Sequence, residues 1–205
     1  VLLQLATLVK GRQSLSRPGV LAAASSPNQR TAIKMGDFYL QAMEADRAAE
    51  VFGRLVGPSD EGLGVPPVTV RVYARIQLAR VLAQKPERQE DAMVVLMQLY
   101  DPAFASEPLA AEGLVWLGVQ TYNSSQNPHL SMPHYRAVLQ RYPDSAAAER
   151  AFYYLCLDLA SLGDDQTTIS ACNGFLKKYP ASRWAARVES LGTKASRKRN
   201  QPKGD

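Results

Sequence analysis

The chain of 205 residues is long enough to bury a sizeable core, either in one large domain or in a short array of repeats. Its 46% hydrophobic and 21% charged residues are ordinary for a globular protein, and no run of 18 apolar residues exists to span a membrane. Four of the five net positive charges lie in residues 194–205. The nearly neutral remainder is not typical of a nucleic-acid-binding domain.

Residues 1–29 are predicted to form an N-terminal helix or a partial repeat. Apolar runs at 1–9 and 19–26 faintly resemble a secretory signal. The first run lacks the basic flank that precedes such a signal, so helices at the edge of a repeat array are the favoured interpretation.

Residues 34–56 predict a hairpin of two helices. Gly36, Tyr39, Ala48 and Phe52 stand at offsets of 0, 3, 12 and 16, in the order small, aromatic, alanine and phenylalanine. These offsets resemble the tetratricopeptide repeat, in which small residues let paired helices approach closely. The resemblance implies a superhelix of stacked helical hairpins.

Three more hairpins are predicted from the small residue of each first helix, at Ala79, Gly118 and Cys156. The intervals from Gly36 onward are 43, 39 and 38 residues, longer than the family repeat of about 34 residues. The excess is assigned to loops rich in turn-forming residues. These predicted loops are residues 57–67, 101–108 and 123–134.

The fourth hairpin, residues 148–180, has the clearest boundaries. Gly163 is predicted to end its first helix in a left-handed cap, and Tyr179-Pro180 to end the second. The pattern Tyr-Pro-x-Ser occurs at 142–145 and again 37 residues later. Each copy is predicted to close one hairpin, and its serine is suited to cap the next helix.

The doubled Tyr-Pro-x-Ser endings resemble the bacterial envelope subset of the tetratricopeptide family. That subset includes a TolA-binding periplasmic protein and the lipoprotein of the outer-membrane barrel-assembly machinery. The resemblance covers roughly residues 30–192 and implies a periplasmic or cell-envelope location, with a cytoplasmic location as the alternative.

The C-terminal residues divide into a capping helix and a tail. Residues 182–191 place Trp184, Val188 and Leu191 on one face, as the last helix of a solenoid requires. Residues 193–205 are basic and poor in apolar side chains, which predicts a disordered tail that is dispensable for folding. The predicted fold is therefore all-α: a solenoid of about four hairpins over 30–192, with terminal capping helices.

No catalytic, metal or cofactor motif stands out. The two histidines, His129 and His134, are five residues apart in a proline-rich stretch without a third ligand nearby. Cys156 and Cys172 lie on the two helices of one hairpin and are interpreted as small core residues rather than a disulfide. We therefore expect a non-enzymatic protein without a metal, a cofactor or a small-molecule substrate.

The resemblance implies a concave groove lined by the first helix of each hairpin. Eight residues are predicted to contact a protein or peptide partner there: Arg30, Asp37, Tyr73, Arg80, Glu112, Tyr122, Arg150 and Tyr153. Tyrosine and arginine are enriched at binding hot spots, which makes four of these the expected anchors: Arg80, Tyr122, Arg150 and Tyr153. The aliphatic groove positions could equally be core: Ile33, Ile76, Val115 and Leu157.

Two classes of function remain open from the sequence. The first is a protein-interaction scaffold that holds a partner polypeptide in an envelope assembly. The second is a structural module of a larger protein that has no ligand of its own. Binding of nucleic acid or an anionic surface through the basic tail is a weaker third hypothesis.

Overall fold

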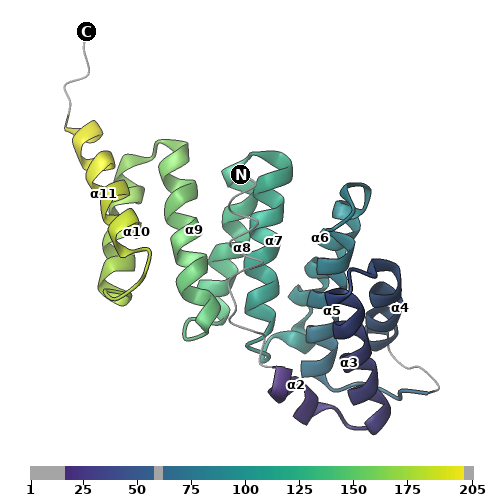
Figure 1. The fold of residues 1–205 in the computed structure, drawn as a ribbon. Helices are drawn as coiled ribbons and strands as arrows, with labels where there is room; N and C mark the ends of the chain where they lie inside the picture. Colours follow the sequence, from purple (N-terminus) through teal and green to yellow (C-terminus); the bar gives the residue numbers. More distant parts are fainter. Residues whose placement is uncertain (1–16, 58–61, 201–205) are drawn as a thin grey trace. The chain divides into compact units, whose positions relative to one another are not determined.

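A computed structural model describes residues 17–57 and 62–200 (Figure 1). These residues form ten α-helices and three short 3-10 helices and contain no strand, which confirms the all-α prediction. Within the same residues, no helix combines the length and the apolar character needed to cross a lipid bilayer. The chain divides into two compact units, an N-terminal unit up to Gly113 and a C-terminal unit from Leu114.

The N-terminal unit is a row of helices, most of which pack on the next helix in the chain. Helix α3 packs on α4, α4 on α5, and α5 on α6, while α2 lies against α5 (Figure 1). The α-helices are α2 (Arg17–Ala23), α3 (Pro27–Gln41), α4 (Ala45–Val56), α5 (Val68–Leu82) and α6 (Gln89–Met97). The 3-10 helices η1 (Pro86–Arg88), η2 (Gln98–Tyr100) and η3 (Pro102–Phe104) flank or follow α6.

Helices α3 and α4 form the first predicted hairpin. Ser26 caps α3 by accepting a hydrogen bond from the Gln29 backbone N–H at 3.2 Å, and Pro27 occupies the first helical position. A Cβ atom added at Gly36 would lie only 2.6 Å from Cζ of Phe52, which is fully buried. The predicted close approach at this small residue is confirmed.

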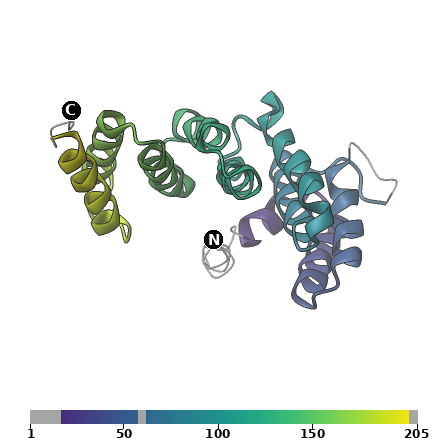
Figure 2. The same cartoon turned by 90° about the horizontal axis from the view of Figure 1, so that it is seen from above.

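The C-terminal unit begins within α7 (Ala110–Ser125) and continues with α8 (Pro128–Arg141), α9 (Ala146–Leu162), α10 (Asp165–Lys178) and α11 (Ala185–Arg199). Consecutive helices from α8 to α11 pack on one another, and most of them are seen nearly end-on in green to yellow in Figure 2. Helices α7 and α8 meet where a Cβ at Gly118 would lie 2.5 Å from the Tyr135 ring.

The two Tyr-Pro-x-Ser segments adopt the same turn, as predicted. Each makes three equivalent backbone hydrogen bonds, and each bond recurs at an offset of 37 residues. The first set joins Tyr142 N to Val138 O, Ser145 N to Tyr142 O, and Ala148 N to Ser145 O; the second joins Tyr179 N to Phe175 O, Ser182 N to Tyr179 O, and Ala185 N to Ser182 O. The two serine hydroxyls differ. Ser182 accepts from the Trp184 backbone N–H just before α11, whereas Ser145 donates to the Tyr142 carbonyl and makes no cap hydrogen bond, so the predicted serine cap is wrong for α9.

The predicted loop at residues 123–134 is mostly wrong. Helix α7 continues to Ser125 and α8 begins at Pro128, so only two residues lie between them. Asn127 caps α8 by accepting from the His129 backbone N–H at 3.0 Å, and proline at the first position needs no hydrogen-bond partner. These turn-forming residues start a helix here instead of extending a loop.

The prediction of a disordered tail from residue 193 is also wrong for the residues that the structure describes. Helix α11 continues to Arg199, and Ala195 is buried at 6% exposure. Arg199 donates to the Gln166 side chain at 2.6 Å, and Lys198 lies 3.9 Å from the Asp165 carboxylate. The apolar face of α11 continues past the predicted boundary through a small residue, which hydropathy alone does not reveal.

Removing residues 194–205 is therefore expected to destabilise the C-terminal unit by about 1–2 kcal/mol, because it removes a buried methyl group and the last turns of α11. Removing only residues 201–205 is the matched control, since it leaves helix α11 complete. The melting temperature, followed by circular dichroism, should fall by a few degrees for the longer truncation only. Equal melting temperatures would show that the last turns of α11 contribute nothing.

Candidate functional site

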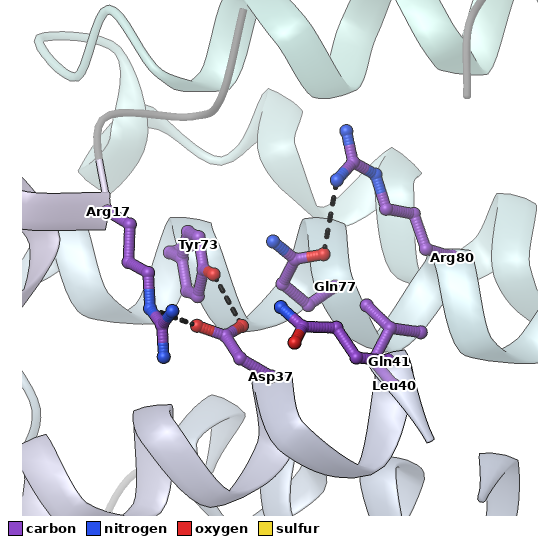
Figure 3. Close-up of a pocket in the computed structure, with 7 residues that line it drawn as sticks. All are labelled: Arg17, Asp37, Leu40, Gln41, Tyr73, Gln77 and Arg80. Carbon is purple, nitrogen blue, oxygen red and sulfur yellow. Dashed lines mark hydrogen bonds and ion pairs between the residues drawn. The ribbon is translucent and has the colours of Figure 1, made fainter. Parts of the chain in front are cut away.

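A pocket in the N-terminal unit brings three predicted partner-binding residues together. Its volume is about 200 Å³, and its walls come from α2, α3 and α5 (Figure 3). Its lining residues are Arg17, Asp37, Leu40, Gln41, Tyr73, Gln77 and Arg80.

Helical spacing explains how the lining residues share this pocket. On α3, Asp37 is followed at i+3 and i+4 by Leu40 and Gln41. On α5, Tyr73 is followed at i+4 and i+7 by Gln77 and Arg80. Residues at these spacings lie on one face of a helix. The two helices thus present polar stripes to a common space, and α2 adds Arg17 from a third side.

Asp37 is the most buried charged group of the pocket. Its side chain is 7% exposed, Tyr73 Oη donates to Oδ1 at 2.6 Å, and Arg17 Nε lies 2.8 Å from Oδ2. Burial raises the pKa of Asp37, and the Tyr73 hydrogen bond and the charges of Arg17 and Arg80 partly offset that rise. Burial and the hydrogen bond to Asp37 raise the pKa of Tyr73, so the phenol stays a proton donor.

The other end of the pocket carries Gln77 and Arg80. Arg80 Nη1 donates to Gln77 Oε1 at 3.3 Å, which uses one of the five N–H donors of a guanidinium. Gln77 itself is buried, while Arg80 is exposed. The pocket therefore presents a carboxylate at one end and a guanidinium with an amide at the other, a pattern suited to recognising charged and hydrogen-bonding groups.

The other predicted partner-binding residues of the N-terminal unit lie outside the pocket. Arg30 donates to the carbonyl oxygens of Leu21 and Ala24, so its side chain holds the link between α2 and α3. Glu112 is half-buried in the first turn of α7. Ile33 and Ile76 are buried, in line with their alternative interpretation as core.

The three predicted residues of the C-terminal unit have different surroundings. Tyr153 is only 6% exposed and stacks on Trp184, with ring centroids 5.1 Å apart and an interplanar angle of 11°. It belongs to the hydrophobic core, which leaves little of its surface for a partner, and its role as an anchor stays a prediction. Tyr122 and Arg150 are half-buried.

Cys156 and Cys172 are both free, fully buried and part of the same core cluster as Tyr153. Their predicted role as small core residues is confirmed. His129 and His134 lie on α8 rather than in the predicted loop. Among residues 17–57 and 62–200, no group of three or more His, Cys, Asp or Glu side chains is placed to hold a metal ion.

Sequence reasoning missed Arg17, Gln41 and Gln77 as pocket residues. Gln77 could have been found, because it stands four residues after Tyr73 on the same helix. Arg17 could not, since it lies 20 residues before Asp37 and no local spacing connects the two. No protein-family model matches the chain, and comparisons with curated proteins and with solved structures find no match either.

Proposed function

We propose that this protein is a non-enzymatic interaction scaffold of tetratricopeptide-like helical hairpins that binds a partner polypeptide. The observation that carries the proposal is the pocket between α3 and α5, the first helices of two consecutive hairpins. Asp37, Tyr73 and Arg80 line it, and the resemblance to the family implies a ligand-facing position for each of them.

The chemistry of the pocket suits a peptide better than an apolar ligand. A peptide carries carbonyl oxygens, amide N–H groups and charged side chains, for which the pocket offers matching donors and acceptors. Arg80 can pair with a carboxylate of the partner, and the buried polar groups Asp37 and Gln77 fix the orientation of a bound segment. Tyr73 is buried and acts through Asp37, whose carboxylate it holds in place by a hydrogen bond.

The doubled Tyr-Pro-x-Ser turns support placing the scaffold in a bacterial envelope assembly, because this ending resembles the envelope subset of the family. The repeated turn geometry also supports a tetratricopeptide-like array, in which one supersecondary unit recurs. The alternative is a structural module of a larger protein that has no ligand of its own. Selection of peptides separates the two, since a module without a ligand should select none.

The full chain is used as bait to select peptides from a random library displayed on phage. We expect the selected peptides to share a sequence pattern. Changing Arg80 to alanine should weaken binding of the selected peptides by about thirtyfold, as truncation of a hot spot typically costs ~2 kcal/mol. The matched control is Arg47→Ala, which removes an exposed arginine of α4 that pairs with Glu44 at 2.7 Å outside the pocket. Circular dichroism should show both variants folded. Selected peptides that bind both variants as tightly as the wild type would exclude the pocket as their site.

A further inference from the structure

The pocket already holds a basic side chain from its own chain. Arg17 enters from α2, and its Nε lies 2.8 Å from Oδ2 of Asp37 (Figure 3). The carboxylate is 7% exposed, whereas the Arg17 side chain is 43% exposed. The pair thus consists of a fixed, buried anion and a cation that solvent, or another molecule, can reach.

The ion pair is close but poorly aligned. Despite the short distance, Arg17 Nε and Asp37 Oδ2 do not have hydrogen-bond geometry, and neither buried atom has another hydrogen-bond partner among the described residues. A buried acceptor without an aligned donor is costly, because burial removes the water that would otherwise satisfy it. A second basic group with better alignment would therefore gain a charge-assisted hydrogen bond that Arg17 does not make.

The surrounding structure leaves room for such a group without displacing α2. The cavity of about 200 Å³ is far larger than the roughly 10–15 Å³ needed for one water molecule. Helix α2 is held by the buried residues Val20 and Ala24 and by hydrogen bonds from Arg30 to Leu21 O and Ala24 O. The Arg17 side chain can thus swing away while its helix stays in place.

We propose that Arg17 is an intramolecular substitute for an arginine or lysine of the partner, which competes with it for Asp37. This inference rests on the proposed function and specifies its ligand: a polypeptide that presents a basic side chain to Asp37. Tyr73 holds the carboxylate in place through Oδ1, and Oδ2 receives the incoming cation. Gln77 and Arg80 at the other end of the pocket contact the neighbouring carbonyl or carboxylate groups of the same peptide.

The probe is the capped tripeptide acetyl-Gly-Arg-Gly-amide, with citrulline in place of arginine as the neutral control of nearly equal shape. Binding is followed by NMR titration of the ¹⁵N-labelled full chain. The arginine peptide should shift the Nε–H resonance of Arg17, which is identified by its absence in Arg17→Gln. The citrulline peptide should not shift it, because it lacks the charge that Asp37 selects.

Arg17→Gln should bind the arginine peptide about fivefold more tightly than the wild type. The peptide then no longer has to break the Arg17–Asp37 ion pair, and a pair of this exposure lowers the affinity of a competitor by up to roughly that factor. Asp37→Asn should weaken binding at least tenfold, and Tyr73 can still donate to its amide oxygen, which favours folding. Arg47→Gln, which removes an arginine that is 66% exposed outside the pocket, should bind like the wild type.

Equal affinity of the wild type and Arg17→Gln for the arginine peptide would contradict the proposal that Arg17 competes with it. Retained binding by Asp37→Asn would contradict the proposal as well. Absence of binding to every variant would overturn it too. These failures are distinguishable from failure of the proposed function. Phage-selected peptides that depend on Arg80 but carry no basic residue would leave the scaffold proposal standing and refute only the role of Arg17.

Discussion

Replacing Gly36 by alanine is expected to destabilise the N-terminal unit, although the same change at Gly53 is expected to stabilise it. A Cβ at Gly36 would lie 2.6 Å from Cζ and 2.8 Å from Cε1 of Phe52. Phe52 is fully buried, so its ring cannot move away without disturbing the packing of α3 on α4. Overpacking of this kind typically costs about 1–3 kcal/mol, and we expect a cost in that range here.

Gly53 is the matched control because it is exposed on α4 and a Cβ there would meet nothing within 4 Å. Both substitutions remove a helical glycine, so both gain about 0.5–1 kcal/mol from backbone entropy. The difference between their unfolding free energies therefore isolates the contact with Phe52. Urea unfolding followed by circular dichroism should give a difference of about 1–3 kcal/mol; equal stabilities would mean that the helices can separate at no cost.

Asp158→Asn is expected to stabilise the C-terminal unit near neutral pH. Asp158 on α9 is 6% exposed and accepts a hydrogen bond from the hydroxyl of Ser131, a fully buried residue of α8. Burial raises its pKa to about 6 from 3.8, and the Ser131 hydrogen bond only partly offsets this. The folded state therefore favours the protonated acid, and asparagine offers Ser131 an oxygen without the charge.

The sign of the pH dependence follows from the raised pKa. The pKa of Asp158 is 3.8 in the unfolded chain and about 6 in the folded state. The stabilisation by protonated Asp158 is therefore complete below pH 3.8 and is lost as the pH rises through about 6. A shift of about two pKa units corresponds to roughly 3 kcal/mol. Because Asp158→Asn does not titrate, its advantage over the wild type should be near zero well below pH 3.8, about 1 kcal/mol at about pH 4.5 and roughly 2–3 kcal/mol at about pH 7.5.

Tryptophan fluorescence reports the unfolding of this unit directly, since both tryptophans of the chain, Trp116 and Trp184, belong to it. Urea unfolding of the wild type and Asp158→Asn at about pH 4.5 and about pH 7.5 gives the four free energies required. Asp164→Asn is the control, because Asp164 is an exposed cap of α10 and asparagine caps a helix equally well. A loss of stability in Asp158→Asn at the higher pH would show that the folded state prefers the carboxylate.

The sequence by itself determined the features that depend on a few neighbouring residues. Gly163 ends α9 in the left-handed conformation with φ 72°, and Tyr142 and Tyr179 follow the last residues of α8 and α10, as predicted. These ends are fixed by the steric limits of glycine and proline, which act within one or two residues. The small residue at Gly36 was also predictable, because helices pack closely only where side chains leave room.

The tertiary structure alone decided which polar groups meet. Arg17 and Asp37 are paired across α2 and α3, and Ser131 and Asp158 across α8 and α9, yet no local pattern connects either pair. Tyr153 occupies a family groove position by spacing, but Trp184, which directly precedes α11, stacks on it. Local sequence sets where each helix begins and ends, whereas the rotation of one helix against the next depends on packing over the whole interface. That rotation determines which side chains are buried, and it therefore determines the pocket.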